Sequence, residues 1–125
     1  MDLKTLKQSF SQLPQIDATA TQLQKSGTHV QWKGLVGSSK SICAAVLAEQ
    51  TPGHHLFILP DKEQAAYFLN DLEELYPEDK RILFYPASYR VPYQLEETDN
   101  ANVVARAEVL EKINSGKNGL SFNCL

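Results

Sequence analysis

One short stretch, from Gly34 to Ser41, constrains the fold of this chain more than any other. It reads Gly-Leu-Val-Gly-Ser-Ser-Lys-Ser and lies between a strand-like run, residues 29–32, and a helix-like run, residues 42–49. A strand, a glycine-containing turn and a helix that opens with Lys-Ser make the layout of a phosphate-binding loop. The sequence therefore predicts an α/β arrangement built around this turn.

The loop departs from the signature Gly-x-x-x-x-Gly-Lys-[Ser/Thr] at one position. Gly34, Gly37, Lys40 and Ser41 are suitable residues in the right order, but Ser39 stands where glycine is expected. In a working loop the backbone N–H groups surround the phosphates, the lysine reaches the terminal phosphates, and the serine hydroxyl holds magnesium. A side chain at position 39 obstructs the backbone's approach and, with an unfavourable φ, strains the turn by about 1 kcal/mol or more.

Hydrolysis of a nucleotide requires further groups: an acidic residue at a later strand end for magnesium, and a group that orients water. No apolar strand in this sequence ends in Asp-Glu, and Asp61, which follows Pro60, is better explained as a helix cap. We therefore expect no complete ATPase here. We interpret Gly34–Ser41 as a structural turn that keeps the shape of a phosphate site, with weak nucleotide or phosphate binding as the alternative.

Strand-like and helix-like runs alternate along the rest of the chain. Asp61 and Gln64 are spaced as a capping box, and Asp17 or Thr19 is expected to cap an earlier helix. The last helix carries a set of apolar residues on one face: Val103, Val104, Ala107, Leu110 and Ile113. The expected strands are residues 29–36, 56–59 and 81–85, and the expected helices are residues 2–10, 18–25, 41–50, 61–76 and one from about residue 98–100 to residue 114.

This alternation is typical of a doubly wound or RecA-like parallel sheet. We expect an α/β fold, a three-layer parallel sheet of the P-loop NTPase type, incomplete because a fourth strand is due and only Lys117–Leu125 follow. The expected organisation is an N-terminal helical segment, residues 1–27, an α/β domain, residues 28–118, and an atypical tail, residues 119–125. A sheet that lacks later strands leaves an edge exposed, so we expect possible self-association or a rearranged tail.

Composition argues against several classes of function. The 12 basic and 15 acidic residues give a net charge of −3, so no general affinity for nucleic acid is expected. No apolar run is long enough to cross a bilayer, and Met1–Phe10 is amphipathic, so we expect a cytoplasmic protein without membrane contact. Cys43 and Cys124 are not spaced as a metal pair, and the adjacent His54 and His55 would point to opposite faces of a strand, so no metal is expected.

Several segments resemble the N-terminal region of the bacterial transcription-repair coupling factors, the Mfd family. Gly34–Ser41 is similar to the family's loop, and Leu-Phe-Ile-Leu-Pro-Asp at residues 56–61 matches its second strand and helix start. Tyr-Pro-Ala-Ser-Tyr-Arg-Val-Pro-Tyr at residues 85–93 matches a loop that ends in Pro-Tyr, and Asn102–Arg106 matches the next helix. The resemblance covers residues 32–113, most of the chain.

The resemblance implies a fold like domain 1a of UvrB, the damage-verification subunit of nucleotide excision repair, with a degenerate Walker A loop. UvrB keeps that loop intact, whereas in the coupling factors ATP and magnesium belong to a DNA translocase module far downstream. No cofactor is therefore expected here. The full-length family protein displaces stalled RNA polymerase and recruits UvrA, mainly through a module after the first domain. The chain looks like a truncated fragment that acts as a non-catalytic scaffold and contacts later domains.

Tyr89, Arg90 and Tyr93 are candidate partner contacts. Such residues can stack on bases, and in UvrB a tyrosine-rich hairpin at the comparable place engages DNA. The segment here is shorter and turns acidic at Glu96-Glu97, so we do not expect direct DNA binding, and packing against its own domain is the alternative. Two other functions stay open: a nucleotide-binding P-loop protein, ATPase or kinase-like, that tolerates Ser39, and a stand-alone interaction module.

Overall fold

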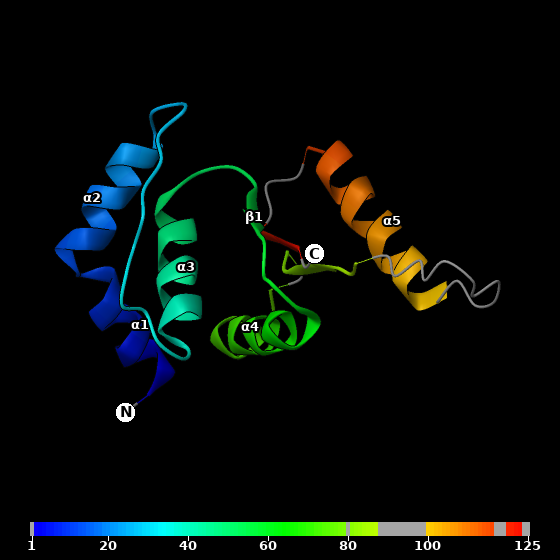
Figure 1. The fold of residues 1–125 in the computed structure, drawn as a ribbon, viewed down its shortest axis with the longest axis horizontal. Helices are drawn as coiled ribbons and strands as arrows, with labels where there is room; N and C mark the ends of the chain where they lie inside the picture. The colour runs from blue at the N-terminus through cyan, green and yellow to red at the C-terminus, as the bar shows by residue number, and fades with distance from the viewer. Residues whose placement is uncertain (1, 80, 88–99, 117–119, 124–125) are drawn as a thin grey trace. The chain divides into compact units, whose positions relative to one another are not determined.

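The computed structural model describes residues 2–79, 81–87, 100–116 and the backbone of residues 120–123. The chain divides into two compact units, each considered by itself: unit 1 is Met1–Pro52 with Asn70–Glu78, and unit 2 is Gly53–Leu69 with Asp79–Leu125. The elements in chain order are α1 (Leu3–Ser11), α2 (Pro14–Leu23), α3 (Ser39–Gln50), β1 (His55–Phe57), α4 (Lys62–Leu75), β2 (Leu83–Tyr85), α5 (Asn100–Asn114) and β3 (Leu120–Asn123) (Figure 1).

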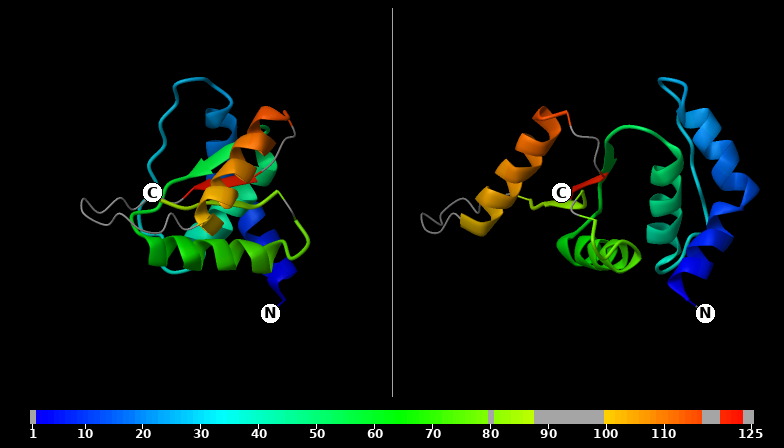
Figure 2. Two further views of the ribbon diagram at one scale, coloured as in Figure 1. Left: turned by 90° about the vertical axis from the view of Figure 1, so that its right-hand side faces the viewer. Right: turned by 180° about the vertical axis from the view of Figure 1, so that it is seen from behind.

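Helix α3 forms the centre of unit 1, where it contacts both α1 and α2 (Figure 2). Its sequence is apolar on nearly every side, which predicted burial on several sides, and the structure confirms this. The core cluster is Ile16, Ile42, Cys43 and Val46, with Leu6, Phe10, Trp32, Leu35 and Leu75 packed around it. Burial raises the pKa of the Cys43 thiol, as expected of a structural rather than a reactive cysteine.

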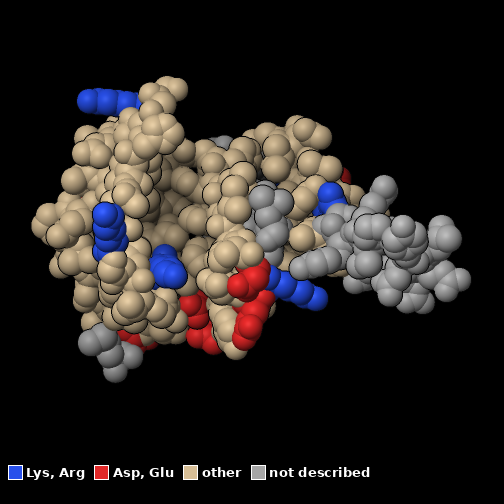
Figure 3. Space-filling view, viewed as in Figure 1, with Lys and Arg blue, Asp and Glu red and all other residues tan. Residues whose placement is uncertain are grey.

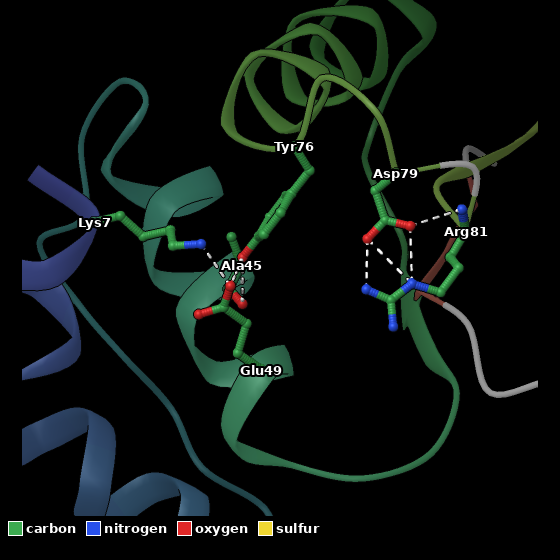
Figure 4. Close-up of polar contacts among 6 residues, drawn as sticks. All are labelled: Lys7, Ala45, Glu49, Tyr76, Asp79 and Arg81. Atoms are coloured by element: carbon green, nitrogen blue, oxygen red, sulfur yellow. Dashed lines mark hydrogen bonds and ion pairs between the residues drawn. The ribbon is translucent and has the colours of Figure 1, made fainter. Parts of the chain in front are cut away.

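A polar network holds α1, α3 and the residue after α4 together within unit 1 (Figure 4). The Lys7 ammonium donates to Glu49 Oε1 at 2.6 Å, and the Tyr76 hydroxyl donates to the same oxygen at 2.7 Å. The Lys7 nitrogen also lies 4.4 Å from the centroid of the Tyr76 ring. One carboxylate thus joins a cation and a phenol from separate parts of the chain, although such exposed pairs each contribute only modestly to stability.

The predicted start of the second helix was wrong. Helix α2 begins at Pro14, with Leu13 as its N-cap, and neither Asp17 nor Thr19 caps it. Pro14 lies in the first turn of α2. Proline is tolerated at this position because the N–H that it lacks would have no partner within the helix. Thr19 is instead buried, and its hydroxyl accepts a hydrogen bond from Trp32 Nε1 at 3.0 Å.

The first predicted strand, residues 29–36, was also wrong. These residues form no strand, and none of the described strands pairs with them. Trp32 and Leu35 are half-buried against the core of unit 1. Burial in this segment does not alternate, because Val30 is 36% exposed. A strand also needs a hydrogen-bonded neighbour, which the pattern alone cannot supply.

The described strands of unit 2 form a parallel sheet in the order β1-β3-β2. Strands β1 and β2 confirm two of the predicted strands, although both are shorter than expected. Residues 120–123, which the sequence assigned to a tail, form β3 between them, in the register His55 with Leu120 and Leu83 with Ser121. Parallel pairing agrees with an α/β arrangement, and the RecA-like and UvrB-like assignments stay predictions.

Helices α4 and α5 contact opposite faces of this sheet. Phe57 is level with Phe84 in the register, so its side chain and that of Leu83 point to opposite faces. Phe57 packs against Phe68 of α4, with ring centroids 5.3 Å apart, whereas the buried Leu83 lines a pocket with Val109 of α5. The β1-to-β2 and β2-to-β3 connections run in opposite directions across the sheet, so right-handed crossovers place their helices on opposite faces.

The predicted apolar face of α5 does not face the core. Val103, Val104, Leu110 and Ile113 are 40–66% exposed, and Val109 is buried instead. The helix carries apolar residues on two sides, and only the side that includes Val109 meets the sheet. Periodicity identified an apolar stripe but not which of the two stripes would be covered.

The predicted cap of α4 is confirmed. The backbone N–H of Gln64 donates to Asp61 Oδ1 at 2.8 Å, and its side-chain amide donates to Asp61 Oδ2 at 2.9 Å. These bonds lower the pKa of the Asp61 carboxyl, the backbone bond most. A second carboxyl with a lowered pKa, that of Asp79, precedes β2. It accepts hydrogen bonds from Arg81 Nη2 at 2.6 Å and from Arg81 Nε at 2.8 Å, and these bonds lower its pKa (Figure 4).

Loss of the hydrogen bond from Trp32, the only tryptophan, to Thr19 should destabilise unit 1. Thr19→Val leaves the Trp32 Nε1–H part-buried without its partner, and we expect a loss of about 1 kcal/mol in urea unfolding followed by Trp32 fluorescence. Thr21→Val is the matched control, because Thr21 is exposed on the same helix. Equal unfolding midpoints for the two variants would contradict this role for Thr19.

Removal of the α4 cap should lower the melting temperature and change its pH dependence. The folded-state pKa of Asp61 lies below its ordinary value of 3.8, so its contribution is present above that pH and is lost as the pH falls through the folded-state pKa. We expect Asp61→Ala to melt earlier at pH 7, and Asp61→Asn to retain most of the cap with a weaker acid dependence. Thermal melts by circular dichroism from pH 2 to pH 7 measure both. A wild-type acid profile in Asp61→Asn would exclude this carboxyl as its source.

Candidate functional site

The loop before α3 has two glycines in left-handed conformations. Gly34 has a φ of +84° and Gly37 a φ of +54°, values that side-chain-bearing residues rarely adopt. Ser38 is the N-cap of α3, but its side chain makes no capping bond. The chain therefore turns sharply into α3, as the sequence predicted from the glycines, but without a strand ahead of the turn.

Ser39, the departure from the phosphate-loop signature, does not strain the turn. It is the first residue of α3, so its φ is helical, and the strain that an unfavourable φ would cause does not arise. Both its hydroxyl and its N–H donate to the Val36 carbonyl, at 2.6 and 3.2 Å. These two bonds close the turn from Val36 to Ser39, and the Ser39 hydroxyl gives the Val36 carbonyl a local donor.

The structure separates the two residues that would hold a magnesium-bound phosphate. Lys40 is exposed, whereas Ser41 is only 3% exposed. The Ser41 hydroxyl donates to Asp71 Oδ2 at 2.6 Å, a short charge-assisted bond. Asp71 lies in the part of α4 that belongs to unit 1, so the bond ties the first turn of α3 to that helix.

Sequence reasoning missed Asp71, although a signal was present. Asp71 follows Phe68 by three residues and precedes Leu75 by four, which places it within the apolar stripe of the helix at residues 62–75. A carboxylate in such a stripe requires a donor, because an unpaired buried charge is costly. The stripe thus predicted that Asp71 has a partner, but not that the partner is Ser41.

The serine that would bind magnesium in a phosphate loop is buried, and its hydroxyl donates to Asp71. Among the residues that the structure describes, no three His, Cys, Asp or Glu side chains gather as metal ligands. The groups left exposed for a phosphate are Lys40 and the N-terminal N–H groups of α3, a combination that can attract an anion.

The candidate partner contacts Tyr89, Arg90 and Tyr93 lie outside the described residues. Their neighbour Tyr85, at the end of β2, is described: Arg106 Nη2 donates to its hydroxyl at 3.1 Å, and the guanidinium lies 4.8 Å from its ring centroid. Tyr85 therefore packs within unit 2, which is the structural role that the sequence analysis weighed against base stacking.

Within each unit, the Lys and Arg side chains on the face drawn in Figure 3 lie singly and form no continuous basic patch. A duplex-binding face needs a continuous basic patch that replaces several counterions. None of the helices that the structure describes has the length and apolar content needed to cross a membrane.

Comparisons of the chain with protein-family models, with curated proteins and with solved structures gave no match. Its function is therefore argued from its own residues and their geometry.

Loss of the Asp71 acceptor should destabilise unit 1 more than loss of the Ser41 donor. Asp71→Ala leaves a buried hydroxyl unpaired, at a cost of about 1–3 kcal/mol, whereas Ser41→Ala leaves a half-buried carboxylate that water can reach. Urea unfolding followed by Trp32 fluorescence measures both, and the double variant gives the coupling energy. Glu73→Ala, an exposed change on the same helix, is the control. Coupling near zero would show that the bond contributes nothing to folding.

Proposed function

We propose that this chain is a non-catalytic α/β module of the kind found at the N-terminus of transcription-repair coupling factors. Its role is a scaffold for contacts with repair proteins and with other parts of the same protein. The observation that carries the proposal is the burial of Ser41, which is only 3% exposed with its hydroxyl held against Asp71, because the oxygen that a phosphate loop uses for magnesium is thereby shielded from solvent. The degenerate loop is then a structural turn rather than a catalytic site.

The positions of the resembling segments support this proposal. The segment Leu56–Asp61 includes the end of β1 and the cap of α4, as the family's strand and helix start require. Tyr85 ends β2, and Asn102–Arg106 lies within α5. The described parts of these segments lie in elements of the type that the resemblance implies, whereas residues 88–93 lie outside the described residues.

The proposal assigns the chemistry of the full-length protein to other modules. ATP and magnesium bind the downstream translocase, and UvrA and RNA polymerase are partners of the whole protein in the cytoplasm. This module contributes intramolecular contacts with later domains and no direct DNA binding. The net charge of −3 supports the last point.

A nucleotide-binding module is the second candidate. Two observations favour it: the left-handed glycines Gly34 and Gly37, and the exposed Lys40 in the first turn of α3. For this function the buried Ser41 oxygen would have to become accessible to magnesium. A stand-alone interaction module is a third reading, favoured by the exposed apolar residues of α5.

Titration of the protein with Mg-ATP separates these candidates. We expect no binding heat and no change in melting temperature at about 1 mM nucleotide. A site with a Kd of about 10 μM would stabilise the fold by about 2.7 kcal/mol under these conditions, which would raise the melting temperature by roughly 10 °C. The expected null result is thus easily told from binding.

The matched variants are Lys40→Ala, inside the motif, and Lys33→Ala, an exposed lysine outside it. Micromolar binding that Lys40→Ala abolishes and Lys33→Ala preserves would establish the second candidate. Measurable ATP turnover that depends on Lys40 would overturn the non-catalytic proposal.

A further inference from the structure

Helix α1 is less buried than the two helices that it contacts, α2 and α3. None of its nine residues is buried, whereas α2 and α3 carry fully buried side chains such as Ile16 and Val46. Leu6 and Phe10 pack against the core cluster but stay partly exposed, and Leu3 is 45% exposed. The apolar attachment of α1 is therefore weaker than the one that holds α2 and α3 together.

Helix α1 also has little stability of its own. Its nine residues are fewer than an isolated helix needs to persist in water. Its N-cap, Asp2, makes no side-chain capping bond, and the helix has no acidic residue in its first turn and no basic residue in its last. The helical state of α1 thus depends on its contact with α3. Loss of that contact should release α1 as one unit.

Polar contacts of unequal strength attach α1 to the rest of unit 1. Lys7 Nζ lies 2.6 Å from Glu49 Oε1 and 4.4 Å from the ring centroid of Tyr76, whose hydroxyl donates to the same oxygen (Figure 4). Gln50 Nε2 donates to the Ser11 carbonyl at 3.4 Å, which is long for a hydrogen bond. The Lys7–Glu49 ion pair is therefore the stronger attachment, because a cation–π contact reinforces it.

The packing of α2 on α3 does not pass through α1. These two helices contact each other directly, and Ile16 of α2 belongs to the same core cluster as Val46 of α3. Gln12 and Leu13 separate α1 from α2, and Leu13 has an extended backbone. A change of backbone dihedral angles at these two residues can move α1 while α2 stays in place.

We propose that α1 is a hinged lid on unit 1, which opens at Gln12 and Leu13 while α2 and α3 stay packed. The Lys7–Glu49 ion pair holds the lid closed and sets how often it opens. Opening uncovers the side of the core cluster against which α1 packs. Because that side is apolar, the closed state is favoured. The inference is independent of the proposed role in repair.

Hydrogen exchange of single backbone amides, followed by NMR on the whole chain at several low urea concentrations, tests the lid. We expect the hydrogen-bonded amides of α1, from Leu6 onward, to share one opening free energy that changes little with urea. The amides of α3 should exchange far more slowly and accelerate steeply with urea, because they open only when the unit unfolds.

Lys7→Gln and Glu49→Gln remove the ion pair from its two sides. Each should speed exchange of the α1 amides about threefold to tenfold. Because Glu49 lies on α3, its effect on α1 cannot come from the helix propensity of α1. Added salt should speed exchange in the wild-type α1 more than in Lys7→Gln, since salt screens the ion pair.

Thr19→Val separates opening of a lid from unfolding of the whole unit. The open and closed lid both retain the bond between Trp32 and Thr19, so its loss should speed exchange in α3 and leave exchange in α1 unchanged. Lys4→Gln, an exposed change on α1, should also leave α1 unchanged. Equal acceleration of α1 and α3 by Thr19→Val would overturn the inference, as would α1 amides as slow as those of α3 or a Lys4→Gln effect as large as that of Lys7→Gln.

Discussion

The arrangement of the loop in this protein depends on the hydrogen bond that one serine hydroxyl donates. Ser41 is almost completely buried, and its hydroxyl donates to Asp71. Without that carboxylate the first turn of α3 would enclose an unpaired polar group, and without that hydroxyl Asp71 would interrupt an apolar stripe without compensation. The pair therefore satisfies two demands at once, and it leaves the loop as a turn into a buried helix.

The residues of the loop that correspond to a phosphate site differ in their accessibility to solvent. The glycines keep the left-handed backbone that lets the chain turn tightly, and Lys40 stays exposed. The serine, which would complete the site, serves the packing of α3 instead. The backbone at Ser39 is not distorted, since Ser39 is helical and bonds to Val36. The proposed scaffold role therefore relies on the burial of the Ser41 hydroxyl rather than on a strained loop.

Unit 2 illustrates a different constraint, the need of a parallel strand for neighbours. Strands β1 and β2 are each three residues long and meet only through β3. Helix α4 contacts one face of the sheet, where Phe68 packs against Phe57. Helix α5 contacts the other face, where Val109 and Leu83 are both buried and line one pocket. The short sheet leaves apolar side chains such as Leu56 and Ile58 exposed and ends at a described strand edge.

The sequence by itself determined the elements whose signals are local. The capping residues of α4, the apolar circumference of α3, the position of α5 and the turn at the glycines all follow from spacing and from backbone preferences. Only the tertiary structure decided the rest. Residues 29–36 alternate like a strand but have no strand to pair with, and Val109 rather than Leu110 is covered because contact with the sheet selects one side of α5. The bond between Ser41 and Asp71 joins residues 30 positions apart, and no local pattern can specify which donor a buried carboxylate will meet.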